Sequence, residues 1–379
     1  MKNIYIIINI TVIFFSLSFL LIALITISSY KITPEFINSY NQNTNECKIC
    51  LLLIKDANKN LIDDNTIESI SLTEESFKVI TSIDIEDPRT FLGRELPAFH
   101  FFDTKIQVAG IGTDYTTLPN ESPPPIEEVL KERQINETEI TKQEKTTKKE
   151  QDNNSIKKTT QGRKVVYLYH SHSWEAFLPS LKNAEVPDEA TSTDENVNII
   201  SVGSKLKQAL EEKGIGTDHN KTNVAKELSK RGWNTNQSYQ YSRGLVTDVL
   251  SSNKDINYLI DIHRDSLRKK NTTVNIKNKS YARLFFIIGE DSKNFEKNLK
   301  LSKELHEAIE KVYPGLSKGV FSKNKTMGNG VYNQDLSENA ILLEVGGVDN
   351  NTDELNNTIQ AFAEVFSQYY WKTSGAKEI

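Results

Sequence analysis

Cysteine is almost absent from this 379-residue chain, whose only two examples, Cys47 and Cys50, form a single Cys-Lys-Ile-Cys sequence. A structural zinc site needs a second cysteine pair or histidines at a matching spacing, and neither accompanies this pair. We interpret the two residues as a local disulfide or as inert thiols. Because no cysteine follows residue 50, the remainder of the chain has no thiol nucleophile.

An excess of charge of one sign is also missing. The 46 Lys and Arg residues stand against 51 Asp and Glu residues and are spread among them. Such a balance gives no electrostatic footprint for nucleic acid, so we expect no nucleic-acid partner. Apolar residues are scarce too, at 37% of the chain, which indicates a sizeable stretch that does not bury enough surface to fold.

The chain has one long apolar run, at its N-terminus. Residues 3–30 contain no charged side chain and are dominated by Ile, Leu, Phe and Val. About 20 apolar residues are enough to cross the hydrocarbon core of a bilayer as a helix. A cleaved signal peptide would have a shorter apolar region ending in an A-x-A-like site, and residues 25–29 offer no clear match. We predict a single-pass membrane anchor over residues 1–30, and cleavage of that anchor stays open.

The composition divides the rest of the chain into three segments. Residues 31–118 are mixed in character, and we assign them to a membrane-proximal region outside the membrane. Residues 119–162 contain three consecutive prolines, at 123–125, followed by a Glu, Lys, Thr, Asn and Gln run. That segment predicts a disordered linker. The composition of residues 163–379 predicts a folded domain.

The folded domain alternates between two kinds of apolar pattern. Short apolar runs typical of buried strands cover residues 164–169, 258–262, 282–288 and 340–345. Apolar residues at helical spacing cover residues 197–213, 241–250, 294–312 and 352–371. This alternation predicts an α/β fold, with a mostly parallel sheet and helices on both of its faces.

Three of the predicted strands end in polar groups. The first runs into a segment with His170, His172 and Glu175, the second into Asp261-Ile262-His263-Arg264, and the last carries Glu344 just before two glycines. In open α/β sheets the ligand crevice lies outside the carboxyl ends of the strands. We therefore expect the three groups to meet there.

These residue types suit a hydrolytic zinc site. Such a site takes three protein ligands from histidine and carboxylate and leaves one position open. We predict His170 and His263 as ligands and Glu175 as the carboxylate ligand, with Asp194 and Glu195 as alternatives for that third position. A further carboxylate must transfer a proton, and we assign Glu344 to this role as general base.

Several polar neighbours have candidate supporting roles. His172 is a further candidate for the third ligand, but because side chains alternate along an extended chain, we expect it to orient substrate instead. Asp261 is expected to bond the outer nitrogen of a liganding histidine. Arg264 is expected either to pair with a substrate carboxylate or to form a structural ion pair. His219 and His306 lie among charged residues, and we predict that both are solvated.

The motifs resemble those of a known family. The sequences His170-Ser171-His172-Ser173-Trp174-Glu175, Asp261-Ile262-His263-Arg264-Asp265-Ser266 and Gly330-Val331-Tyr332-Asn333-Gln334-Asp335-Leu336 are similar to signatures of the stage II sporulation protein P family. These proteins are cell-wall hydrolases of endospore-forming bacteria. Residues 340–350 also resemble the end of zinc-dependent N-acetylmuramoyl-L-alanine amidases.

The resemblance implies a specific activity and setting. Members cleave the amide between N-acetylmuramic acid and L-alanine in peptidoglycan, and cross-link endopeptidase activity has been credited to them. They act outside the mother-cell membrane during engulfment, alongside sporulation proteins D and M. By position, His170 and His263 match the metal-site histidines and Glu344 the catalytic glutamate. The chain departs from the broader amidases because no Gly-rich segment follows its first histidine. This departure leaves the third ligand open.

Two other classes of function fit the same sequence. One is a zinc endopeptidase or carboxypeptidase that cuts within the stem peptides. The other is a non-catalytic, membrane-tethered scaffold that binds the wall or partner proteins. Only an amidase leaves muramic acid without a peptide. Absence of metal, together with binding to peptidoglycan that a chelator does not affect, would favour the scaffold.

Overall fold

A computed structural model describes residues 104–121, 124–139, 141, 159–325 and 327–374. The predicted anchor, the cysteine pair, most of the membrane-proximal region and the centre of the linker lie outside these residues, as does His100, for which we predict a structural role. In the part of the chain that is described, no helix combines the length and apolar character needed to span a membrane.

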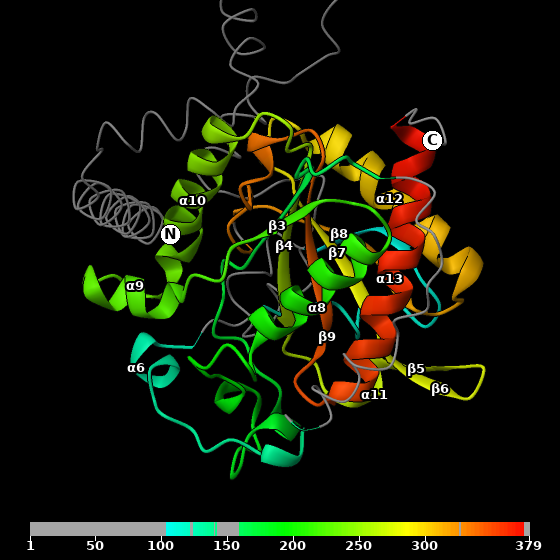
Figure 1. The fold of residues 1–379 in the computed structure, drawn as a ribbon. Helices are drawn as coiled ribbons and strands as arrows, with labels where there is room; N and C mark the ends of the chain where they lie inside the picture. The colour runs from blue at the N-terminus through cyan, green and yellow to red at the C-terminus, as the bar shows by residue number, and fades with distance from the viewer. Residues whose placement is uncertain (1–103, 122–123, 140, 142–158, 326, 375–379) are drawn as a thin grey trace, which may run out of the picture. The chain divides into compact units, whose positions relative to one another are not determined.

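A seven-stranded sheet forms the centre of the folded unit, with strand order β1-β8-β7-β9-β4-β2-β3 (Figure 1). Its strands are β1 (Lys105–Ala109), β2 (Val166–Tyr169), β3 (Thr217–His219), β4 (Tyr258–Asp265), β7 (Leu284–Gly289), β8 (Ser317–Lys323) and β9 (Ala340–Gly347). β3, β2, β4 and β9 are parallel to one another. β7 is antiparallel to β9 and parallel to β8, and β1 is antiparallel to β8.

The sheet is therefore mixed: four of its six described strand pairings are parallel, in line with the predicted mostly parallel sheet, and the β7–β9 and β1–β8 pairings are antiparallel. A parallel connection needs a crossover, usually a helix, whereas an antiparallel strand can be reached by a shorter path. Between β4 and β7 the chain forms only the short helix α11 (Lys269–Thr272) and a hairpin of β5 (Thr273–Ile276) and β6 (Lys279–Ala282). β7 consequently enters the sheet in the opposite direction to β4 and β9.

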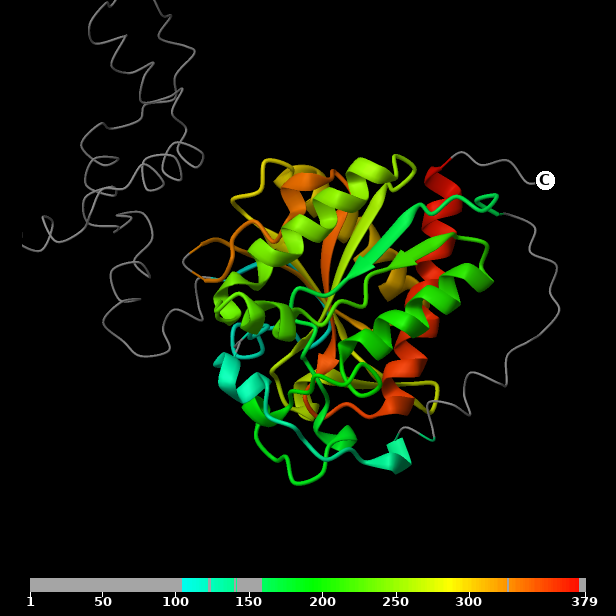
Figure 2. The same cartoon turned by 60° about the vertical axis from the view of Figure 1, so that its left-hand side comes forward.

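Helices cover both faces of the sheet, as Figure 2 shows. α8 (Ile199–Glu212), α12 (Phe295–Val312) and α13 (Thr352–Thr373) share one apolar core with one face, while α10 (Ser238–Ser252) packs on the other. α9 (Val224–Lys230) and α6 (Ile126–Val129) lie beyond the end of α10. The four strands and four helices predicted from the sequence are confirmed, with bounds that differ by a few residues.

Strict alternation along the parallel strands separates the two faces. In β2, Val166 and Leu168 pack in the core shared with α8, while Tyr167 and Tyr169 pack with Val246 of α10. Residues in register on neighbouring parallel strands point to the same face. Each polar residue near a strand end can therefore be assigned to the α8 face or to the α10 face.

The folded unit begins well before residue 163. β1 pairs with the edge strand β8, and Val129 of α6 packs in a buried cluster with Trp174. The ammonium of Lys318, a side chain with 1% of its surface exposed, donates to the carbonyl of Gly112 and to Thr117 Oγ1. Parts of the predicted membrane-proximal region and linker thus belong to the folded unit. Composition missed them because a few anchoring contacts, rather than a long apolar pattern, hold them in place.

Candidate active site

Two histidines and one glutamate form a cluster at the carboxyl ends of β2 and β4. Glu121, His172 and His263 each offer a ligand atom, and these atoms lie within 4.8 Å of one another. His172 follows β2, His263 lies in β4, and Glu121 comes from the segment that precedes α6. Both histidines are buried, at 2% and 0% exposure.

Glu175 lies against both histidines. Its Oε1 is 3.1 Å from His172 Nδ1, and its Oε2 is 3.5 Å from His263 Nδ1. The backbone N–H of Arg264 donates to Oε2 at 2.8 Å. On the other side, Glu121 Oε1 is 3.3 Å from His172 Nδ1.

These spacings fit a tetrahedral zinc ion. Ligand atoms about 2.1 Å from such an ion lie about 3.4 Å from one another. The contacts of the two Nδ1 atoms with carboxylate oxygens fall close to that separation, and His263 Nδ1 has no hydrogen-bond partner among the described residues. The donor set of two imidazoles and carboxylates is the one that hydrolytic zinc sites use. The residues present therefore fit the metal.

Asp261 contacts the outer nitrogen of His263, as the sequence predicts. Its Oδ1 forms an ion pair with His263 Nε2 at 3.0 Å. Ser171 donates to the same carboxylate from both its backbone N–H, at 2.9 Å, and its hydroxyl, at 2.5 Å. Both Asp261 and His263 are fully buried.

The charges in the cluster depend on one another. Burial on its own would lower the pKa of His263, but the carboxylates of Asp261 and Glu175 raise it well above its usual value. Burial would raise the pKa of Glu175, but His263 and His172 hold it well below its usual range. Asp261 and Glu175 thus favour a positive charge between them.

Glu344 lies beside the cluster on the α10 face of the sheet. It stands in register with His263 on the neighbouring parallel strand. It is 1% exposed, and its Oε2 has no hydrogen-bond partner among the described residues. Burial, together with the negative charges of Glu175, Asp265 and Glu121, raises its pKa well above the usual range, although His263 acts in the opposite direction. A carboxyl group in this state is able to hold a proton and to release it.

His170, which we predicted as a ligand, lies on the opposite face. Tyr169 is in register with Asp261, so the next residue points to the α8 side. There His170 Nδ1 donates to the carbonyl of Ile262 at 3.0 Å, and its Nε2 lies 2.8 Å from His219 Nε2. A Cβ at Gly203 of α8 would lie 2.6 Å from both Nε2 atoms, so this glycine makes room for the pair. The structure brings His172, not His170, to His263.

The other candidates also have definite places. The Arg264 guanidinium donates to the carbonyl oxygens of Ala190 and Asp265, which makes its contacts structural. Asp194 accepts from the backbone N–H of Asn196, and Glu195 is exposed. Neither carboxylate belongs to the cluster.

The prediction that His219 and His306 are solvated is wrong. His219 is mostly buried against His170, and burial together with His170 lowers its pKa. His306 is 5% exposed, and its Nδ1 lies 2.7 Å from Ser317 Oγ. Both follow charged neighbours in sequence, but the helix and the strand end turn them inward.

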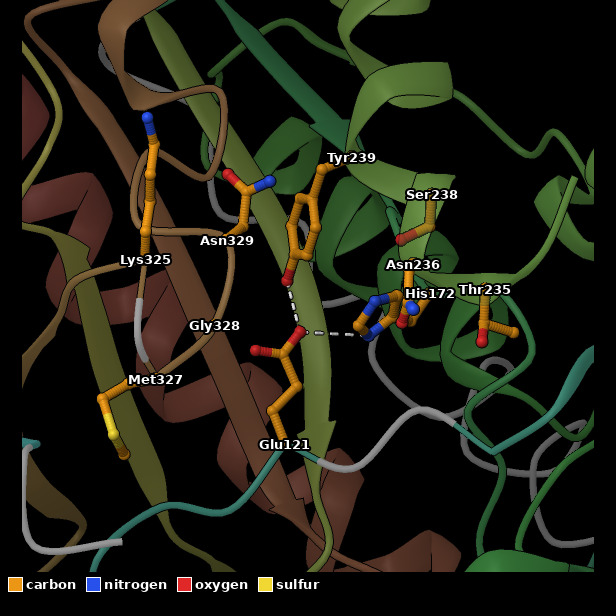
Figure 3. A pocket seen from close by; sticks show the side chains of 10 residues that line it. All are labelled: Glu121, His172, Thr235, Asn236, Ser238, Tyr239, Lys325, Met327, Gly328 and Asn329. Atoms are coloured by element: carbon orange, nitrogen blue, oxygen red, sulfur yellow. Dashed lines mark hydrogen bonds and ion pairs between the residues drawn. The ribbon is translucent and has the colours of Figure 1, made fainter. Parts of the chain in front are cut away.

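A cavity of about 530 Å³ opens next to the cluster (Figure 3). Its walls come from the segment before α6, the start of α10 and the loop after β8. The lining residues are Glu121, His172, Thr235, Asn236, Ser238, Tyr239, Lys325, Met327, Gly328 and Asn329. Glu121 lies between Tyr239, whose hydroxyl donates to it, and His172. The cavity volume is within the range of small-molecule sites, roughly 300–1,000 Å³.

Glu121 is the residue that sequence reasoning missed. We placed it in the disordered linker because three prolines follow it. Two hydrogen bonds of its neighbour Asn120 hold Glu121 in place. The Asn120 N–H donates to Asp265 at 2.9 Å, and the Asn120 carbonyl accepts from the N–H of Ser266 at 3.1 Å. A signal was present in the sequence, since prolines stiffen an extended segment as well as break regular structure.

The fold and the cluster define an α/β protein with a buried histidine–carboxylate site able to hold a metal ion beside a cavity. Comparisons with known proteins identify the family. A model of the stage II sporulation protein P family matches residues 86–367. Stage II sporulation protein P of Bacillus subtilis (strain 168) is 53% identical over 306 residues, which are 81% of this chain and 76% of that protein. The chain belongs to the stage II sporulation protein P family.

Two amidases are among the solved structures that match part of this chain at low similarity. The N-acetylmuramyl-L-alanine amidase Ami1 of Mycobacterium abscessus is 11% identical and matches 54% of this chain and 95% of its own, with a TM-score of 0.31. The CwlD amidase of Clostridioides difficile is 17% identical and matches 56% of this chain and 100% of its own, with a TM-score of 0.35. The family assignment rests on the two sequence matches.

Proposed function

We propose that this protein is a zinc-dependent N-acetylmuramoyl-L-alanine amidase that removes stem peptides from peptidoglycan. The observation that carries the proposal is the pair of buried imidazole Nδ1 atoms at 3.1–3.5 Å from carboxylate oxygens, beside a cavity. Membership of the stage II sporulation protein P family supports a role in remodelling the cell wall during sporulation.

His172 and His263 would hold the zinc ion together with Glu175, and Glu121 offers a further carboxylate on the cavity side. Zinc bound there would supply a Lewis acid that polarises the carbonyl of the scissile amide. Asp261 orients His263 from behind, while the Arg264 N–H fixes the carboxylate of Glu175. The protein thus keeps the ligands in place before substrate arrives.

Glu344 would transfer the proton that amide hydrolysis requires. The attacking water must lose a proton, and the leaving amine must gain one. The raised pKa of Glu344 suits the second step, and the charge of a zinc ion bound by the neighbouring His263 would favour the ionised form needed in the first. Oε2 is the atom available for both, because it has no hydrogen-bond partner among the described residues.

The setting of the reaction follows from the family and from the predicted anchor. We propose that the predicted helix in residues 1–30 tethers the protein to the membrane with the folded unit outside, next to peptidoglycan. Sporulation proteins D and M are the proposed partners during septal remodelling and engulfment. The endopeptidase and scaffold alternatives gain no specific support from the described residues.

Digestion of purified peptidoglycan by the full-length protein tests the bond that is cut. Mass spectrometry of the products is expected to show glycan strands with bare muramic acid and free peptides that begin with L-alanine. Cuts inside the peptide, with L-alanine still attached to muramic acid, would assign the site to an endopeptidase instead.

The two carboxylates are expected to differ in their hold on zinc. Glu175 contacts both histidines and is fixed by a backbone N–H, whereas Glu121 contacts only His172 of the pair and lines the cavity. Glu175→Gln should therefore lose zinc on dialysis, while Glu121→Gln should keep about one ion per chain. Metal analysis by mass spectrometry measures this, and the reverse order would make Glu121 the principal carboxylate ligand.

A further inference from the structure

One sequence motif, Gly330–Leu336, contributes no residue to the metal cluster but is firmly attached around it. Gln334 accepts from the N–H of Gly289 at 2.9 Å and donates to the carbonyl of Ile287 at 2.8 Å, both at the end of β7. Asp335 receives two hydrogen bonds, at 2.8 and 2.7 Å, from the guanidinium of Arg243 on α10. The motif therefore ties the sheet to α10.

The backbone of this motif takes a conformation that tyrosine rarely adopts. Tyr332 and Asn333 have φ angles of 54° and 57°, in the left-handed region. Asparagine tolerates this region, but a tyrosine there is unfavourable and persists only where its surroundings hold it. Tyr332 is fully buried, and its ring meets that of Tyr239 edge to face, with 5.2 Å between the ring centroids. The turn directs the Asn333 side chain inward, to 3% exposure.

A chain of buried hydrogen bonds leads from Asn333 to the cluster. Asn333 Nδ2 donates to Ser242 Oγ at 2.9 Å, and Ser242 Oγ lies 2.7 Å from Ser171 Oγ. Ser171 Oγ lies 2.5 Å from Asp261 Oδ2. Asn333, the two serines and Asp261 are each at most 3% exposed.

Donor counting gives this chain a single direction. A serine hydroxyl has one proton. Ser171 gives its proton to Asp261, so Ser242 is the donor in the 2.7 Å contact between the two hydroxyls, in preference to the carbonyl of Tyr239, which lies at 3.3 Å. Ser242 Oγ then accepts from the amide of Asn333, which has two protons to give and also reaches the carbonyl of Tyr239 at 3.2 Å. Every donor in the chain points toward the carboxylate.

We propose that Asn333, Ser242 and Ser171 are positioning residues that hold the Asp261 carboxylate against His263 Nε2. With its proton on Nε2, the imidazole presents the Nδ1 lone pair toward Glu175 and the proposed metal position. This inference rests on the proposed function and gives the Gly330–Leu336 motif a role in it. Partners that orient metal ligands in this way change metal affinity or activity by about 10- to 100-fold when they are removed.

The decisive variant is Ser242→Ala, which interrupts the chain by removing one oxygen atom. We expect it to weaken zinc binding by about 10- to 100-fold, measured by competition with a chromophoric chelator on the full-length protein. Ser302→Ala is the matched control, because Ser302 is equally buried on α12 and its hydroxyl has no hydrogen-bond partner among the described residues. The control should bind zinc like the wild type.

Asn333→Gly provides a second variant, since glycine keeps the left-handed turn and removes the donor. We expect weaker zinc binding in this variant too, by a smaller factor because Ser242 and Ser171 remain. Equal zinc affinity in the wild type, Ser242→Ala and Asn333→Gly would overturn the proposal. Such a result would show that these hydrogen-bonded side chains only fill the core.

Nitrogen NMR of histidine-labelled, metal-free protein gives a readout that does not depend on zinc. The wild type is expected to show a His263 Nε2 proton that Asp261 protects from exchange with solvent, and Ser242→Ala is expected to show faster exchange of this proton. If the wild type failed to bind zinc but the exchange of this proton became faster in Ser242→Ala, the positioning role would stand and the proposed function would fail. An unchanged exchange rate in Ser242→Ala would refute the positioning role itself.

Discussion

Replacing Glu344 with glutamine is expected to slow amide hydrolysis by about 10²–10⁴-fold, the usual contribution of general acid–base catalysis. Glutamine keeps the shape of the side chain but cannot take up or release the proton. Because Glu344 lies beside the histidines rather than against either Nδ1 atom, zinc should stay bound at about one ion per chain. The rate of peptide release and the metal content of the same sample test both halves of the prediction.

Glu310→Gln is a suitable control for this variant. Glu310 is a partly buried glutamate on α12 that accepts from the backbone N–H groups of Gly315 and Ser317, away from the cluster. Its replacement is expected to lower the melting temperature without changing the rate. If Glu344→Gln kept most of its activity, the proton would have to be carried by another group, and Glu121 would be the first to examine.

Replacing His263 with glutamine is expected to abolish both zinc binding and hydrolysis. The change removes one of the two imidazole ligands and leaves the buried Asp261 and Glu175 without their shared partner. Loss of the Lewis acid is worth several kcal/mol of transition-state stabilisation, which corresponds to a rate decrease of about 10³-fold or more. Metal analysis and peptide release measure the two effects.

His170→Asn separates the metal site from the general need for buried histidines. His170 is buried on the α8 face, where it bonds Ile262 and His219. We expect this variant to keep zinc and to unfold at a lower temperature, because it disturbs a buried hydrogen-bonded pair. Loss of zinc in His170→Asn with retention in His172→Gln would reverse the assignment.

The positions of the strands and helices were predictable because their patterns are local. Apolar runs located β2, β4, β7 and β9, and the parallel order of β2, β4 and β9 brought their carboxyl ends together. The direction of β7 was not predictable, because it depends on the connection through the β5–β6 hairpin rather than on the strand itself. β8 was missed since its polar residues, among them Lys318, are buried by partners far away in sequence.

The choice between His170 and His172 depended on where β2 ends. The sequence offered both, and alternation from Tyr169 placed His170 on the α8 face, while the turn after the strand brought His172 back to the α10 face. Glu121 lies well outside the segment that the patterns marked as folded, and contacts of Asn120 and of the Tyr239 hydroxyl hold it at the cluster. The prolines that follow it indicate a stiff segment, but no local pattern shows which distant residues that segment meets.

The most direct test of zinc-dependent cleavage between muramic acid and L-alanine is to digest peptidoglycan with the full-length protein before and after removal of metal. We expect a chelator to stop the release of peptides that begin with L-alanine. One equivalent of zinc is expected to restore this release in the wild type but not in His263→Gln. Undiminished release of the same peptides by protein shown to be free of metal would contradict zinc-dependent cleavage.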